Sequence, residues 1–520
     1  MTSPLRTRLI ELVGHGHLQD SAEDRTFYSM DIYGRGAEPA LAICPTSTDQ
    51  LAEAVGMITD AGHAVIPRGG GVSYTGGIVP DRTESVVVDT SCMTKVLAID
   101  PESMYVTVEA GCTWEQLRMA LRSHGVRTPF WGPLSGGRAT IGGSLAQQAV
   151  MWGSSAHGPS SDSVLGLEVV MADGSIMRTG MGAMSGAEPF WRHYGPDLTG
   201  LFLADAGALG VKAQVTLRLI REPEHADFAS FSFSTRTELT AAMTEIARSG
   251  LANSGFSLDP IMQDHRIRRA GLRQGAEAAI EMIGSAGNKL TAIRDAVRMA
   301  AKGRGFLDAD GYSLHLVVDG PSQAAVDASL QAIHAICAGG RKVEATVPRL
   351  LHAKPYASLI SALGPEGQRW APLNCILPLA RADTGWDRLE RFFVERAALM
   401  EEANVEVGFM VSTISTTAIL IEMVMTWPGP LTPYYERVLE PPVLKRLPRY
   451  DPQPESEELV ARIRDDLMDV FVELGAAHLQ IGRSYPYRRA MDQGTWELLS
   501  SLKNAVDPRG LMNPGALGLA

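Results

Sequence analysis

A glycine-rich segment at residues 66–77 constrains the fold more than any other feature of this chain. It reads Ile-Pro-Arg-Gly-Gly-Gly-Val-Ser-Tyr-Thr-Gly-Gly, with five glycines in twelve residues, and it lies between apolar runs at 64–66 and 86–88. Because glycine has no Cβ, the backbone N–H groups of such a segment can converge on one anion. The segment is neither a Walker loop nor a G-x-G-x-x-G fingerprint entering a helix. It predicts a phosphate-binding loop of another type, placed directly after a strand.

Composition limits the classes of protein that the chain can belong to. Its 520 residues, 45% hydrophobic and 20% charged, are typical of a globular protein with two or three domains. A net charge of −12 argues against nucleic acid or an anionic membrane as a partner. The first residues lack the apolar core of a signal peptide, and no run of 18 apolar residues follows. We therefore expect a cytoplasmic protein.

The five cysteines are scattered, without a CxxC pair, and so predict neither a zinc site nor a disulfide framework.

Periodicity predicts an α+β fold with two lobes. Residues 40–220 alternate helical and strand patterns, including a helix at 49–58 after the cap candidates Ser47 and Thr48 and a capping box formed by Thr113 and Gln116. A charged, proline-containing break at 221–225 precedes strand patterns of a different texture and a proline-rich, loop-like stretch at 428–454. We expect a first domain at 1–225, a second at 226–465, and a C-terminal segment at 466–520 that rejoins the first domain.

Two more glycine-rich segments lie in the first lobe. One spans residues 136–143, and the other spans 205–210, just before a predicted strand. Glycine-rich turns are common, and each of these segments is weak evidence alone. Three in one lobe predict a large cofactor with a pyrophosphate and flat rings, held mainly by backbone amides.

Several motifs resemble the vanillyl-alcohol oxidase/p-cresol methylhydroxylase flavoprotein superfamily. They are the loop at 68–77, Ala-Thr-Ile-Gly-Gly at 139–143, Val-Leu-Gly-Leu-Glu-Val-Val-Met at 164–171, Tyr-Gly-Pro-Asp-Leu-Thr-Gly at 194–200 and Asn-Pro-Gly at 513–515. The resemblance covers nearly the whole chain and is particularly close to the aryl-alcohol oxidase and 4-cresol dehydrogenase branch. It implies a PCMH-type FAD-binding domain formed by the first lobe and the tail, with residues 226–465 as a cap over the flavin.

The resemblance assigns the cofactor-binding residues to four segments. They are Arg68, Gly69, Gly70, Gly71, Val72, Ser73 and Tyr74 in the first loop, Thr140, Ile141, Gly142 and Gly143 in the second, Gly210 and Val211 in the third, and Asn513 near the C-terminus.

A pair of residues near the C-terminus resembles the phenolate-binding element of the family. Tyr487 and Arg488 stand ahead of Met-Asp-Gln at 491–493, and Tyr485 is the alternative in register. An arginine beside a tyrosine hydroxyl would stabilise a buried oxyanion through charge-assisted hydrogen bonds. The alternative interpretation is a solvated basic loop, because three arginines occur in seven residues.

Other positions depart from the family pattern. Val72 stands where many relatives attach flavin to a histidine, and the comparable cap stretch at 411–420 has no histidine, tyrosine or cysteine. We therefore expect non-covalent FAD. The active-site tyrosine of the first loop is displaced, with Thr75 nearest in register and Tyr74 one residue earlier.

His157 and Asp162 are candidates for the general base or for a group that tunes the flavin. A packed histidine and a turn-capping aspartate are the alternative interpretations. The paired histidines of the D-2-hydroxyacid dehydrogenase relatives do not occur, and His478 is a lone histidine, so we expect no catalytic metal.

These features predict an FAD-dependent oxidoreductase that oxidises a para-substituted phenol or an aryl alcohol by hydride transfer to flavin N5. The alternatives are metal-independent oxidation of a 2-hydroxyacid or another alcohol, and a non-catalytic flavin-binding protein. The expected electron acceptor is O2 or a redox protein, and related proteins suggest a homo-oligomer.

Overall fold

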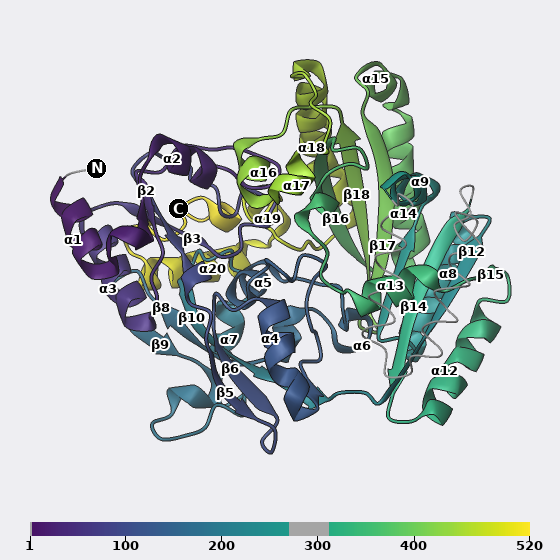
Figure 1. The fold of residues 1–520 in the computed structure, drawn as a ribbon, viewed down its shortest axis with the longest axis horizontal. Coiled ribbons are helices and arrows are strands. Elements are labelled where there is room, and N and C mark those ends of the chain that lie inside the picture. The colour runs from purple at the N-terminus through teal and green to yellow at the C-terminus, as the bar shows by residue number, and fades with distance from the viewer. Residues whose placement is uncertain (1–2, 270–310) are drawn as a thin grey trace.

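The computed structural model describes residues 3–269 and 311–520. The N-terminal part contains two main sheets (Figure 1) and a two-stranded pair of β7 (Val126–Arg127) with β11 (Ile220–Arg221). The smaller main sheet has the order β1 (Leu18–Gln19), β2 (Leu41–Ile43), β4 (Ser85–Asp89) and β3 (Ala64–Arg68). The pairings of β4 with β2 and β3 are parallel, and helices α1 (Ser3–Val13) and α3 (Thr48–Asp60) share its core. Ser47 caps α3, as its sequence predicts.

The second sheet of this part is antiparallel and has five strands. Their order is β5 (Val96–Asp100), β6 (Tyr105–Glu109), β10 (Val211–Arg218), β8 (Val164–Val170) and β9 (Ile176–Arg178). Helices α4 (Trp114–Leu121) and α5 (Ile141–Gln147) bury their apolar residues in the core of this sheet. The capping box of Thr113 and Gln116 at α4 is confirmed.

A seven-stranded antiparallel sheet forms the other half of the molecule (Figure 1). Its order is β15 (Arg341–Val343), β12 (His225–Phe233), β14 (Tyr312–Gly320), β13 (Ser254–Leu258), β17 (Glu406–Ile414), β18 (Ala418–Trp427) and β16 (Arg369–Pro378). Helices α8 (Arg236–Ser249), α12 (Gln323–Ile336) and α14 (Ala382–Val394) pack in its core, together with the long α18 (Pro454–Leu474). Alternate strand residues therefore face away from these helices.

The C-terminal segment returns to the first two sheets. Helices α19 (Tyr487–Ala490) and α20 (Gln493–Val506) lead into a strand-like contact between Met512 and Val65 of β3. In Figure 1 this segment, drawn in yellow, lies beside the purple and blue N-terminal elements. The ends of the chain thus complete one half of the molecule together.

The expected α+β fold is confirmed, and two local predictions are wrong. The proline-rich stretch at 428–454 contains two short helices, α16 (Pro433–Val438) and α17 (Pro441–Leu444), each with proline in its first turn. Proline is tolerated there because the first N–H groups of a helix have no intrahelical partner. Cys44 and Cys92 form a disulfide, which their spacing of 48 residues does not reveal. The expected domain boundaries stay predictions. No helix of the described chain is long and apolar enough to span a membrane.

Candidate functional site

The glycine-rich segments meet at one groove between the two N-terminal sheets. Its lining includes Arg68 and Gly69 of the first segment, Gly142 and Gly143 of the second, and Gly210 of the third. Val211 lines the groove as well. Six of the predicted cofactor residues therefore share one site, although they come from segments far apart in the sequence.

Close backbone approaches shape this groove. A Cβ atom on Gly142 would lie 2.6 Å from the Cβ of Ala110, and one on Gly210 would lie 2.5 Å from Cγ1 of Val169. Gly71, in the first loop, has φ +74°, a conformation that side-chain-bearing residues rarely adopt. Glycine at these positions lets the loops pack tightly enough to present their backbone to a ligand.

The guanidinium of Arg68 does not contribute to the groove lining. Its Nη1 donates to the carbonyl oxygen of Met30 at 2.9 Å, and the group stacks over the ring of Phe27, and neither residue lines the groove. What suits an anionic ligand is the backbone, because the glycines of three segments line the groove and their N–H groups can converge without Cβ atoms in the way. The residues present therefore fit FAD.

Asn513 and Arg483 join the first loop to the C-terminal segment. Nδ2 of Asn513 donates to the carbonyl oxygens of Gly77 and Ala206, at 2.9 and 2.6 Å. Nη2 of Arg483 donates to Oδ1 of Asn513 and to the carbonyl oxygen of Pro514, and its Nη1 donates to the carbonyl oxygen of Gly76. The side chain of Asn513 thus positions the glycine loop from behind.

A buried polar cluster lies where the first loop meets the seven-stranded sheet. Glu422 of β18 and Asn374 of β16 are paired across the sheet. Their neighbours Ile421 and Leu373 belong to the helix-covered core, so Glu422 and Asn374 face the opposite side. The Tyr74 side chain lies close enough to the carboxyl group of Glu422 for the charge of that group to raise the pKa of Tyr74. Burial raises the pKa of Glu422 to about 7 and also raises that of Tyr74.

Tyr485 and His478 complete this polar cluster. The backbone N–H of Asn374 donates to the Tyr485 hydroxyl at 2.8 Å. His478 stacks on Tyr485 with 4.0 Å between ring centroids, and its Nδ1 lies 2.9 Å from the carbonyl oxygen of Asn374. A carbonyl can only accept, so Nδ1 carries the proton. Burial lowers the pKa of His478 to about 4, which keeps the ring neutral with Nε2 as an acceptor.

The other predicted catalytic residues lie outside the polar cluster. Tyr487 is half-buried at the start of α19, and the guanidinium of Arg488 stacks over Trp496, 5.1 Å from the ring centroid. His157 ends the short helix α6 (Ser154–His157), where burial and the charges of Arg127 and Arg218 lower its pKa. Asp162 is exposed beside Ser161. Their roles stay predictions.

Comparisons with known proteins agree with this geometry. The family model described as "FAD binding domain" matches residues 39–180, and the model described as "FAD linked oxidases, C-terminal domain" matches residues 448–517. The chain has the fold of the FAD-linked oxidases. The matched regions are those of FAD-dependent oxidoreductases, and FAD is their cofactor.

Two curated relatives are similar in sequence to part of this chain. The chain is 30% identical over 225 residues to glycolate oxidase subunit GlcD from Bacillus subtilis, a match that covers 43% of this chain and 46% of that protein. It is 26% identical to D-lactate dehydrogenase [cytochrome] 1, mitochondrial, from Saccharomyces cerevisiae, covering 46% and 39%. The matches thus span less than half the length of these relatives.

Solved structures with this fold align over the whole chain. A p-cresol methylhydroxylase with substrate bound gives a TM-score of 0.74 at 17% identity, covering 100% of this chain and 98% of that one. A 4-ethylphenol oxidase from Gulosibacter chungangensis gives 0.71 at 17% identity, with the same coverage. At this identity the likeness establishes the fold alone.

Sequence reasoning missed several residues of both regions. Gly207 and Lys212 line the FAD groove, and Lys212 forms a buried ion pair with Asp205 at 2.6 Å. Glu422 and Asn374 were detectable as single polar residues within apolar strand patterns, since a buried polar residue usually has a specific partner. No group of three or more His, Cys, Asp or Glu side chains that could hold a metal ion is found among residues 3–269 and 311–520.

Proposed function

We propose that this chain is an FAD-dependent oxidoreductase that oxidises a para-substituted phenol or an aryl alcohol at the polar cluster. The observation that carries the proposal is the position of the Glu422 carboxyl group beside Tyr74, between the flavin loop and the sheet, where burial raises its pKa to about 7. Bound FAD supplies the acceptor for the hydride that leaves the benzylic carbon. The protein's own groups supply the proton chemistry and the orientation.

Glu422 is the proposed general base. A base is most effective when its pKa lies near the working pH, and a pKa of about 7 meets this condition at neutrality. The carboxylate would accept the proton of the substrate hydroxyl as electron density moves towards the benzylic carbon. Tyr74 lies beside this carboxyl group.

Tyr74 and Tyr485 are the proposed hydrogen-bond donors to the substrate oxygen. Burial raises the pKa of both hydroxyl groups, so both stay protonated at neutral pH. Donors that are fixed in a site with little water stabilise a developing phenolate strongly. Tyr485, the alternative in register to Tyr487, lies in the polar cluster, and we therefore propose Tyr485 for the role predicted for Tyr487.

The arginines at the polar cluster favour a neutral substrate over a carboxylate. Arg464 donates to the carbonyl oxygens of Pro372 and Tyr74 at 3.0 and 3.4 Å and stacks over Tyr33. Arg483 binds the loop and the C-terminal segment. Both guanidinium groups are engaged with the protein itself, and a 2-hydroxyacid carboxylate needs a cationic partner.

A 2-hydroxyacid is the second candidate substrate. It is favoured by the names of the curated relatives, glycolate oxidase and D-lactate dehydrogenase. Oxidation of such a substrate would need one of these arginines to release its present acceptors.

Anaerobic flavin reduction tests the proposal. The FAD-loaded protein is mixed with 4-ethylphenol, with 4-methoxybenzyl alcohol and with D-lactate, and the loss of visible flavin absorbance is followed. We expect reduction by the first two, and slowing by about 10²-fold or more in Tyr485→Phe. Tyr450→Phe, a change at a partly exposed tyrosine outside the polar cluster, is the control. If D-lactate alone reduced the flavin rapidly, a 2-hydroxyacid would replace the phenol or aryl alcohol as the proposed substrate.

A further inference from the structure

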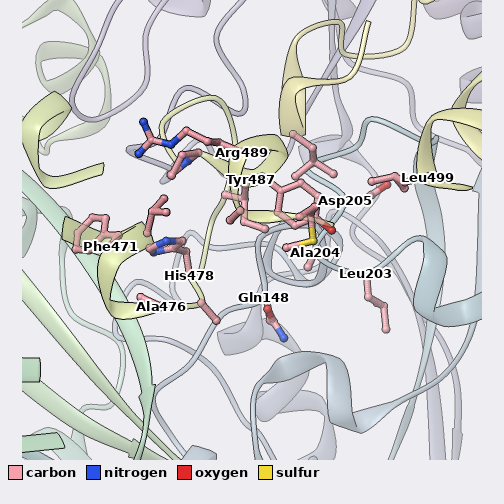
Figure 2. Close-up of a pocket in the computed structure, with 18 of the residues that line it drawn as sticks. Gln148, Leu203, Ala204, Asp205, Phe471, Ala476, His478, Tyr487, Arg489 and Leu499 are labelled. Carbon is pink, nitrogen blue, oxygen red and sulfur yellow. The ribbon is translucent and has the colours of Figure 1, made fainter. Parts of the chain in front are cut away.

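A second cavity, of about 700 Å³, lies beside the FAD groove (Figure 2). It is formed by the end of α18, the segment around α19, and the short helix α7 (Leu198–Leu201) with the residues that follow it. Most of its lining is apolar, with Leu203, Leu209, Phe471, Ala476, Leu499 and Leu517 among the contributors. A cavity of this size and polarity suits a flat, largely apolar small molecule.

The cavity and the FAD groove share a wall that is one backbone thick. Gln147 lines the groove, and the next residue, Gln148, lines the cavity. Likewise, Ala206 lines the groove, and Asp205 lines the cavity. The backbone N–H of Ala206 donates to the carbonyl oxygen of Ala146, which ties the two wall segments together. A molecule in this cavity is therefore adjacent to the cofactor site, and it meets the polar cluster at His478.

Polar side chains interrupt this otherwise apolar lining, namely Gln148, Asp205, His478, Tyr487 and Arg489. The carboxylate of Asp205 is enclosed, with the residue 2% exposed and Oδ1 accepting from Lys212. Nδ1 of His478 donates to the carbonyl oxygen of Asn374, which leaves Nε2 as the acceptor of that ring. Tyr487 is a donor whose pKa is raised by burial, so its hydroxyl stays protonated. Arg489 pairs with Asp469 at 2.8 Å, but both side chains are more than half exposed, and such pairs are weak. Figure 2 shows Asp205, Tyr487 and Arg489 around the same space.

We propose that this cavity binds a quinone that accepts the two electrons of the reduced flavin. The inference rests on the proposed function, because that function supplies the electrons. The quinone carbonyls would accept hydrogen bonds from Tyr487 and Arg489. After reduction, a hydroquinone hydroxyl would donate to Nε2 of His478, the acceptor side of that ring.

The step balances without another reactant. The quinone would gain two electrons and two protons and become the hydroquinone, and the FAD that the groove would hold would supply both from its reduced form. The mixed set of donors and one unpaired acceptor suits an oxygen that changes from carbonyl to hydroxyl. A carboxylate ligand would instead meet the charge of Asp205.

Flavin reoxidation tests this proposal independently of any substrate. FAD bound to the protein is reduced with dithionite under anaerobic conditions, and 1,4-naphthoquinone is then added. We expect a reoxidation rate that saturates with quinone concentration. Leu203→Trp and Ala476→Phe fill the cavity and should each raise the half-saturating concentration by about tenfold or more. Leu97→Trp, at an exposed residue of β5, should leave it unchanged.

A rate that stays linear in quinone concentration, with equal slopes in the wild type and both filled variants, would overturn the proposal. Reoxidation by O2, measured in the same proteins, controls for an intact flavin site. Because dithionite replaces the substrate, failure of phenols to reduce the flavin would count against the proposed function only. Loss of saturation would count against the quinone site only.

Discussion

At the scale of single residues, the proposed chemistry depends on the setting of Glu422. Its ordinary pKa of 4.5 is raised to about 7 by burial, and the neighbouring Tyr74 opposes this rise. Because of the same desolvation, ionisation of Glu422 lowers the stability of the folded protein. Between about pH 4.5 and pH 7 the folded state binds more protons here than the unfolded state does, so this contribution to stability is lost as pH rises.

Glu422→Gln is expected to change both activity and stability in a pH-dependent way. In the wild type, substrate-driven flavin reduction should accelerate with pH, with a midpoint near pH 7, as the carboxylate forms. The glutamine variant should be about 10²- to 10⁴-fold slower, with this rise removed. Chemical denaturation should show the variant gaining stability over the wild type from pH 5 to pH 8, by about 3 kcal/mol at most. An unaltered pH profile of reduction would remove Glu422 from the mechanism.

At the scale of elements, the FAD groove depends on how closely α5 approaches the neighbouring backbone. Gly142 lies in the first turn of α5, and its backbone N–H donates to the carbonyl oxygen of Ala110 at 2.8 Å. Thr140 caps the helix by accepting from the N–H of Gly143. The start of α5 is therefore fixed both by its cap and by contact with the residue after β6.

Gly142→Ala is expected to weaken FAD binding by about tenfold or more. The added Cβ would lie 2.6 Å from that of Ala110 and so push the start of α5 out of place. Fluorescence titration of the flavin-free protein with FAD measures the effect. Gly56→Ala in α3 is the matched control, since its Cβ would meet nothing closer than 3.4 Å and alanine favours a helix interior by about 1 kcal/mol. Equal affinities in the two variants would contradict the close-approach argument.

At the scale of the whole molecule, the disulfide between Cys44 and Cys92 encloses the first loop in a covalent ring. Cross-linking across 48 residues removes conformational freedom from the unfolded chain. The loop entropy of such a ring corresponds to about 4 kcal/mol. Disulfides are rare in reducing compartments such as the cytoplasm. The cytoplasmic location stays a prediction, and the bond is a reason to test it.

Reduction of the disulfide is expected to lower the thermal stability of the protein. Scanning calorimetry with and without a phosphine reductant should show a shift of several degrees, and Cys44→Ser should reproduce it without the reductant. Thiol titration of the denatured, unreduced protein should find the three free cysteines Cys112, Cys337 and Cys375. A count of five thiols together with an unchanged transition would contradict the bond.

The glycine segments, helix caps and α+β pattern could be recognised from the chain alone because each depends on residues close in sequence. Backbone freedom at residues 68–77 predicts a loop around a large anion wherever that loop lies. The polar cluster could not be predicted in this way. Tyr74, Asn374, Glu422 and Tyr485 come from four distant segments, and only their packing selects Tyr485 over Tyr487 and raises the pKa of Glu422. The sequence alone thus predicts the cofactor-binding loops, because their backbone geometry depends on neighbouring residues. The composition of the polar cluster and the pKa values of its groups depend on the folded structure, because desolvation and proximity arise only when distant segments pack together.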